Sequence, residues 1–156
     1  IRDSARGINA FRGAGRRFEF LGEVNGVTIA DDYAHHPTEL EATLRAAKEM
    51  DYKRVWAVFQ PFTYTRTQML LDDFARVLQI ADKVVMTEIM GSRERAEDYA
   101  VRTKDLAAKI PGSVWYDTFD EVVDHVMKNA RPGDLVITLG CGDIYKAAKK
   151  MVAWEA

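Results

Sequence analysis

The chain has 156 residues, of which 47% are hydrophobic and 29% charged, and its formal net charge is −2. These values predict one soluble globular domain with a sizeable core, and they argue against a general DNA- or RNA-binding protein, which needs a basic excess. The longest apolar runs, such as Val55–Phe59, are too short to span a membrane, and one cysteine, Cys141, excludes an internal disulfide and favours a reducing cytoplasm.

The chain opens on residues 1–15, which are rich in glycine and arginine and are expected to form a linker from a preceding domain. We expect no signal peptide, because this stretch has no apolar core. Residues 18–22 and 27–30 flank Asn25-Gly26, the strongest short signal for a β-hairpin. The domain itself is therefore expected to cover residues 16–156 and to begin with a hairpin.

After the hairpin, strands and helices alternate to the end of the chain. A possible capping box, Thr38 with Glu41, and a second one, Thr118 with Glu121, mark helix starts. Repeated strand–helix units with short apolar strands predict an α/β fold: a doubly wound, mostly parallel, Rossmann-like sheet with flanking helices. The expected strands are 55–60, 84–89, 114–116 and 135–139, and the expected helices are 37–50, 69–80, 103–110, one from Thr118, and 144–154.

In such sheets, ligands bind outside the carboxyl ends of the strands. The densest polar cluster, Asp31–Pro37, follows the second hairpin strand and contains two carboxylates, a phenol and two imidazoles. It can be a binding loop or only a solvated turn in which Pro37 starts a helix. A metal site is the weaker interpretation, because His125 and Cys141 lie far away in the sequence.

Three further clusters remain open on their residues alone. In Gln60–Thr67, Arg66 can hold a carboxylate or phosphate at a helix entrance, or Thr67 can cap the helix while Arg66 lies on the surface. Leu139–Ile144 lacks the third glycine of a dinucleotide fingerprint and favours a tight turn, with Cys141 as a small filler rather than a thiol of lowered pKa. The pair Arg16-Arg17 is, by itself, a solvated charge patch.

Taken in order, these motifs resemble the C-terminal domain of the Mur ligases, within them the branch that joins L-alanine to a muramate. The segments that carry the resemblance are Gly13–Glu19, Asp31–Glu39, Phe59–Thr67 and Gly140–Ile144. They extend over nearly the whole chain, and the nine-residue Asp31–Glu39 motif is highly specific.

The resemblance implies an ATP-dependent ligase of three domains in the bacterial cytoplasm, acting in peptidoglycan precursor synthesis. ATP, with Mg²⁺, would phosphorylate the carboxylate of UDP-N-acetylmuramate, and the amine of L-alanine would then displace phosphate. By resemblance, Arg17 and Asp32 would contact ATP, whereas Tyr33, His35 and Arg66 would bind L-alanine, with Arg66 on its carboxylate. No nucleophile and no metal ligand are expected in this domain, and its protein partners would be the other two domains.

The sequence departs from the family at two places and leaves two alternatives open. Phe62-Thr63 stands where many relatives have His-Arg, which leaves Arg66 as the one arginine of its loop, and Cys141 replaces a common alanine. Because the chain has no Gly-x-x-x-x-Gly-Lys-Ser/Thr loop, it is expected to be inactive alone. The alternatives are a ligase that recycles a tripeptide onto the same muramate, and a stand-alone nucleotide-binding regulatory module.

Overall fold

Asn25-Gly26 forms the tight turn between the first two strands. Both residues have a positive φ, 52° for Asn25 and 84° for Gly26, as a two-residue hairpin turn of this kind requires. β1 (Glu19–Val24) and β2 (Val27–Asp32) pair antiparallel, so the predicted hairpin is confirmed. The computed structural model describes residues 18–154, and the expected linker at 1–15 lies outside them.

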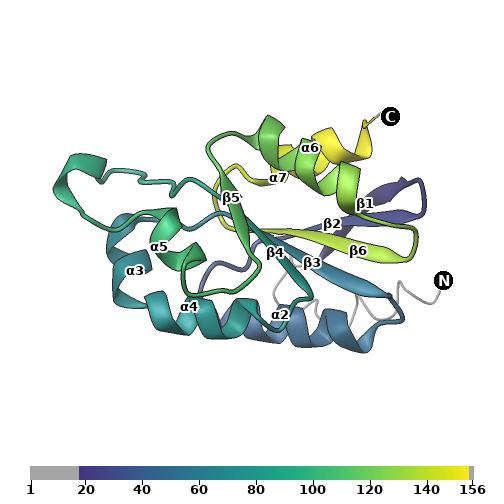
Figure 1. The fold of residues 1–156 in the computed structure, drawn as a ribbon, viewed down its shortest axis with the longest axis horizontal. Coiled ribbons are helices and arrows are strands. Elements are labelled where there is room, and N and C mark those ends of the chain that lie inside the picture. Colours follow the sequence, from purple (N-terminus) through teal and green to yellow (C-terminus); the bar gives the residue numbers. More distant parts are fainter. Residues whose placement is uncertain (1–17, 155–156) are drawn as a thin grey trace.

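The hairpin forms one edge of a six-stranded sheet with the order β1-β2-β6-β3-β4-β5 (Figure 1). Only the β1–β2 pair is antiparallel, since all other pairings in the described chain are parallel. The predicted doubly wound α/β sheet is therefore confirmed, although the hairpin belongs to the sheet rather than preceding it. The other elements are α2 (Pro37–Glu49), β3 (Arg54–Phe59), α3 (Tyr64–Met69), α4 (Leu71–Leu78), β4 (Lys83–Thr87), the 3-10 helix η2 (Ala96–Asp98), α5 (Thr103–Ala107), β5 (Val114–Tyr116), α6 (Phe119–Asn129), β6 (Asp134–Leu139) and α7 (Tyr145–Val152).

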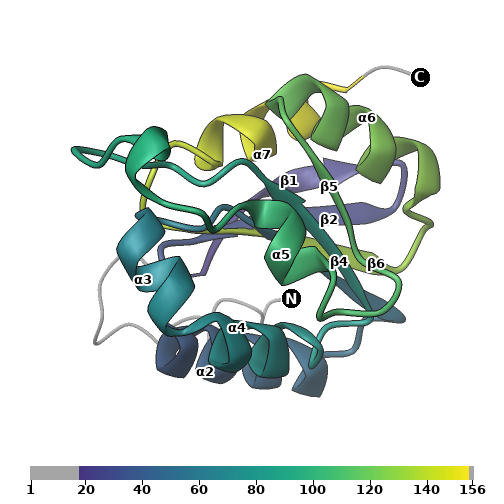
Figure 2. The same ribbon diagram turned by 60° about the vertical axis from the view of Figure 1, so that its left-hand side comes forward.

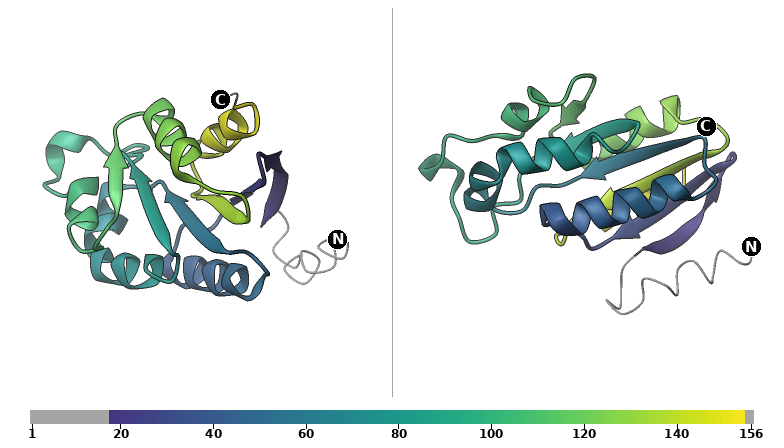
Figure 3. Two further views of the ribbon diagram at one scale, coloured as in Figure 1. Left: turned by 45° about the vertical axis from the view of Figure 1, so that its right-hand side comes forward. Right: turned by 90° about the horizontal axis from the view of Figure 1, so that it is seen from below.

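Helices cover both faces of the sheet and create two cores. α2, α4 and α5 lie on one face and α6 and α7 on the other (Figures 1 and 2). Because successive side chains of a strand point to opposite faces, β3 sends Val55, Ala57 and Phe59 into the first core and Trp56 and Val58 into the second. Seen from below, α2 and α4 run side by side beneath the strands (Figure 3).

The helix starts are confirmed in part. Thr118 caps α6, since its hydroxyl accepts from the backbone N–H of Glu121 at 3.2 Å. The box predicted for α2 is wrong by two residues: His36 is the cap, and Glu39 accepts from its backbone N–H at 3.3 Å. The single helix expected over 69–80 is two helices, α3 and α4, which meet at Leu70. Among the described helices, none combines the length and the apolar character that crossing a membrane requires.

Candidate functional site

Three adjacent strands end at one level of the sheet. Asp32 of β2 is paired with Leu139 of β6, and Leu139 is paired in turn with Phe59 of β3. The loops that follow, with the first turn of α3, therefore leave the sheet at the same end, and we call residues 33–36, 60–66 and 140–144 the carboxyl rim. This common end was predicted, but β6 lies between β2 and β3, so the loop that leads to Arg66 does not follow β2's immediate neighbour.

This rim is also where the chain turns to different faces of the sheet. After β3 the chain continues toward α4 on the first face, and after β6 it continues into α7 on the second (Figure 1). Such a divergence between neighbouring strands leaves a crevice for ligands in open α/β sheets. The arrangement supports a binding site at the carboxyl rim.

Asp32 is fully buried at the start of the rim. Its Oδ1 accepts from the backbone N–H of Ala34 at 2.8 Å and its Oδ2 from the Thr43 hydroxyl at 3.0 Å. A carboxylate enclosed in this way fixes the loop after β2 against α2. These bonds give Asp32 a positioning role in the described structure, and its expected contact with ATP remains a prediction.

Tyr33 and His35 form an aromatic pair beside the loop that follows β3. The two rings are edge-on with centroids 5.7 Å apart, and His35 lies 6.4 Å from the ring of Phe62. The backbone N–H of His35 donates to Glu39 at 3.2 Å, which ties the loop to the first turn of α2. Tyr33 is 44% exposed, so part of its side chain faces solvent at the rim.

Arg66 lies in the first turn of α3. The helix begins earlier than predicted because the Thr63 hydroxyl, rather than Thr67, caps it by accepting from the N–H of Arg66 at 3.2 Å. The guanidinium makes no hydrogen bond or ion pair with any described residue. Its charge is a minor contribution toward a lower pKa at Glu94 and at Cys141, although burial raises the pKa of Cys141 overall. Arg66 is thus a half-buried cation at the rim with its donors free.

Glu94, from the segment that follows β4, contacts the rim at the start of α3. Its carboxylate accepts from the Thr65 hydroxyl and from the backbone N–H groups of Tyr64 and Thr65, closing the open end of α3. The hydroxyl bond is the main cause of the lowered pKa of Glu94. Since residues 90–102 show neither strand nor helix periodicity, no sequence signal ties Glu94 to α3.

The loop after β6 packs tightly against Gln60. The Gln60 amide nitrogen donates to Asp143 at 3.0 Å, while its Oε1 is the one buried side-chain oxygen or nitrogen of the described residues without a partner. Gly140 has φ of +150°, and a Cβ there would lie 3.2 Å from the carbonyl oxygen of Gln60. Burial raises the pKa of Cys141, so this cysteine is a filler residue rather than an activated thiol.

We expect Gly140→Ala to destabilise the domain by about 1–3 kcal/mol, because an L side chain rarely adopts this backbone conformation. Urea unfolding followed by circular dichroism measures the change in the free energy of unfolding. Cys141→Ala is the matched control in the same loop, and its loss should be much smaller. Equal losses in the two variants would mean that the Gly140 backbone is not strained by a side chain.

A cavity of about 480 Å³ opens at the rim on the side of β1 and α7. Tyr33 and the glycine loop contribute to its wall, but His35 and Arg66 do not, so the expected convergence on one cleft holds only in part. The cavity contains acidic and basic side chains together with exposed aromatic ones. Its lining residues are Glu19, Leu21, Asp31, Tyr33, Gly140, Cys141, Gly142, Tyr145 and Lys149.

Two other expected residues lie apart from this rim. Arg17 is outside the described residues. His125 lies on α6, where its Nδ1 is 3.0 Å from the Tyr116 hydroxyl and its ring is edge-on to Trp56, so its predicted remoteness is confirmed. In the described part of the chain, histidine, cysteine and acidic side chains nowhere gather in a group of three suited to a metal ion.

Comparison with known families decides the assignment. The family model described as Mur ligase, glutamate ligase domain, matches residues 16–142. The chain belongs to this family.

Curated relatives of this Mur ligase domain extend over almost all of it. It is 42% identical to the UDP-N-acetylmuramate–L-alanine ligase of Acetivibrio thermocellus over 98% of the chain, and 45% identical to that of Lachnospira eligens over 94%. These alignments take up 34% and 32% of the two relatives, so the chain spans about a third of their length.

Solved structures agree with the Mur ligase fold. The UDP-N-acetylmuramate–alanine ligase of Thermotoga maritima matches with a TM-score of 0.71 at 24% identity, over 88% of this chain and 29% of that one. The murein peptide ligase of Psychrobacter arcticus gives 0.70 at 25% identity, over 89% and 29%. A Haemophilus ducreyi domain, assigned to a UDP-N-acetylmuramate:L-alanyl-γ-D-glutamyl-meso-diaminopimelate ligase, gives 0.68 at 26% identity, over 88% of this chain and 98% of that one.

Proposed function

We propose that the chain is the amino-acid-binding domain of an ATP-dependent ligase that joins L-alanine to UDP-N-acetylmuramate in the bacterial cytoplasm, as a step of peptidoglycan precursor synthesis. The observation that carries the proposal is the gathering of Tyr33, His35 and Arg66 at one rim, in a chain more than 40% identical to ligases of that name. Arg66 has no side-chain partner among the described residues. Its guanidinium can bind the carboxylate that every amino-acid substrate carries.

In this proposal Arg66 grips the carboxylate of L-alanine, and Tyr33 and His35 enclose its methyl group. Fixing the carboxylate leaves the amine free to attack the acyl carbon of the muramoyl phosphate. The new C–N bond forms, the C–O bond to phosphate breaks, and the amine loses a proton. A fixed cation removes much of the rotational freedom of so small a substrate, and closure of the rim excludes water that would hydrolyse the acyl phosphate.

ATP and Mg²⁺ would be held mainly by other parts of the full-length enzyme. The chain has no phosphate-binding loop of the Gly-x-x-x-x-Gly-Lys type, and its described residues form no carboxylate cluster for the metal. ATP would supply the phosphoryl group that activates the muramate carboxylate. Arg17 and Asp32 remain proposed to contact ATP, and Asp32 also holds the rim loop in place.

The 156-residue chain alone is expected neither to hydrolyse ATP nor to ligate L-alanine, because it lacks the phosphate-binding loop. Release of inorganic phosphate, with and without L-alanine, measures this. Turnover that survives Arg17→Ala would contradict the assignment as one domain of a larger ligase and would favour a self-contained nucleotide-binding module.

The acceptor distinguishes the two ligase alternatives. The solved relatives include ligases of muramoyl peptides at 25–26% identity, so a tripeptide acceptor is the competing function. The full-length enzyme should release ADP only when UDP-N-acetylmuramate is present. Its kcat/KM should be much higher for L-alanine than for L-alanyl-γ-D-glutamyl-meso-diaminopimelate. The reverse preference would assign the chain to peptide recycling.

A further inference from the structure

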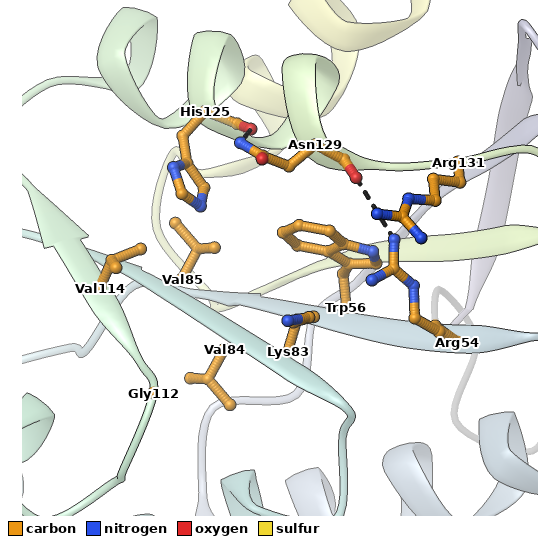
Figure 4. Close-up of a pocket in the computed structure, with 10 residues that line it drawn as sticks. All are labelled: Arg54, Trp56, Lys83, Val84, Val85, Gly112, Val114, His125, Asn129 and Arg131. Atoms are coloured by element: carbon orange, nitrogen blue, oxygen red, sulfur yellow. Dashed lines mark hydrogen bonds between the residues drawn. The ribbon is translucent and has the colours of Figure 1, made fainter.

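A second cavity, of about 230 Å³, lies at the opposite end of the sheet from the carboxyl rim. Its origin is the short β5. The pairing of β5 with β4 begins at Val85, opposite Val114, so Lys83 and Val84 at the start of β4 pair with β3 but have no strand on their other side. The gap is bounded by β3 on one side and roofed by α6 (Figure 4). A Cβ at Gly112 would meet nothing within 4 Å, so this border of the cavity is open.

Three cations line the cavity, and two of them have no carboxylate partner. Arg54 is neutralised by the buried Asp134 at 2.8 Å. Lys83 and Arg131 form no side-chain hydrogen bond or ion pair with a described residue. Figure 4 shows Arg131 beside Arg54 at one end, and Lys83 on the far side of the Trp56 ring. An excess of two positive charges therefore borders the cavity.

The aspartates that precede Lys83 and His125 in the chain are already engaged. Asp82 pairs with Lys48 at 2.8 Å and accepts from the backbone N–H of Val55. Asp124 pairs with Lys128 at 3.1 Å. Neither pairs with Lys83 or Arg131, and both cations are exposed, so their charges are accessible to an anion from solution.

The roof adds a neutral donor. Burial lowers the pKa of His125. The charge of Lys83 lowers this pKa further, whereas that of Asp124 raises it, and the ring is uncharged near neutral pH. Its Nδ1 lies 3.0 Å from the Tyr116 hydroxyl. When that hydroxyl donates to Nδ1, the ring proton is on Nε2, which can donate to an anion in the cavity.

We propose that this cavity is a binding site for a small phosphate- or carboxylate-bearing anion, separate from the carboxyl rim. Lys83 and Arg131 supply charge, His125 supplies a hydrogen bond, and the indole of Trp56 with Val85 forms the apolar wall. A volume of about 230 Å³ is below the range of about 300–1,000 Å³ typical of drug-sized ligands, so the site accepts an anion smaller than a nucleotide.

The indole N–H of Trp56 reports on the site, because the ring lines the cavity while Nε1 is fixed on Asp134 at 2.9 Å. The ¹⁵N-labelled 156-residue chain is titrated at constant ionic strength with inorganic phosphate in one arm and malonate in the other. Trp56→Phe identifies the indole signal. We expect a saturable shift of this signal in at least one titration. Saturation with phosphate would identify a phosphate site, and saturation with malonate a carboxylate site.

Lys83→Gln and Arg131→Gln should each weaken the binding about tenfold, the effect of losing one charge-assisted hydrogen bond. Lys104→Gln, which removes the same charge from an exposed site on α5, should leave it unchanged. A linear, non-saturating shift in both arms, or equal weakening by all three variants, would overturn the proposal in favour of general surface electrostatics. These readouts do not depend on ligase activity, so their failure leaves the proposed function untouched.

Discussion

In the full-length ligase, Arg66→Ala is expected to raise the KM for L-alanine about thirtyfold or more, with a smaller effect on kcat. Removing one partner of a desolvated charge pair costs about 2–5 kcal/mol, and the lower value already corresponds to this factor. The structure supports a large effect because Arg66 is half-buried and has no described partner that would share its charge. Because Arg66 is the one arginine of residues 60–67, no second arginine of this loop can compensate.

Two further variants make the Arg66 result interpretable. Arg66→Lys should restore only part of the affinity, since an ammonium cannot hold a carboxylate with two parallel hydrogen bonds. Arg93→Ala, at an exposed position of the neighbouring 88–102 segment, should leave the alanine KM unchanged. Initial rates at saturating ATP and UDP-N-acetylmuramate measure all three. A normal KM in Arg66→Ala would show that Arg66 is a surface residue without a part in substrate binding.

Asp134→Ala is expected to destabilise the domain by about 3–5 kcal/mol, the cost of breaking a buried ion pair from one side. The Asp134 carboxylate is 1% exposed and accepts from the guanidinium of Arg54, the indole of Trp56 and the backbone N–H of Arg131. Its removal leaves these donors unpaired where β3 and β6 begin. The free energy of unfolding in urea at pH 7 measures the loss.

The pH dependence of this stabilisation has a definite sign. Burial opposes ionisation of Asp134, but the hydrogen bonds from Arg54, Arg131 and Trp56 outweigh it and lower the pKa of the carboxyl. A carboxyl group with a lowered pKa in the folded state stabilises the protein at pH values above the ordinary aspartate pKa. This stabilisation is lost as the pH falls through the folded-state pKa. The wild type and Asp134→Ala should therefore converge in stability at acid pH.

Asp72→Ala is the control for Asp134→Ala. Its side chain is 88% exposed, and its ion pair with Lys109 should contribute less than about 1 kcal/mol. If the two variants lost the same free energy of unfolding at pH 7, the buried hydrogen bonds of Asp134 would contribute no more to stability than an exposed ion pair.

The secondary structure was largely predictable because its signals are local. Asn25-Gly26 determines the hairpin, and the apolar run Val55–Phe59 identifies a strand buried on both faces. The place of β6 was not predictable, since insertion between β2 and β3 depends on pairings between residues about a hundred positions apart. The start of α3 was missed for a related reason: Glu94, thirty residues away, closes its amino end.

The site was predictable as a set of loops but not in its details. Asp31–Pro37 and Gln60–Thr67 follow strands, so their common end follows from the fold class. Whether a side chain in such a loop faces a ligand or the interior depends on packing. Asp32 is an example of a side chain that faces the interior. Its carboxylate accepts hydrogen bonds from Ala34 and Thr43, and no sequence-spacing rule predicts these partners.

The central position of β6 also governs how the chain can fold. β2 and β3 do not pair with each other, and each waits for a strand that lies more than seventy residues further along the chain. During synthesis the ribosome must release β6 before either can complete its hydrogen bonds on that side. Such a dependence on distant contacts slows folding and leaves strand edges exposed in the meantime, so we expect a nascent chain of this domain to be prone to aggregation until β6 has been synthesised.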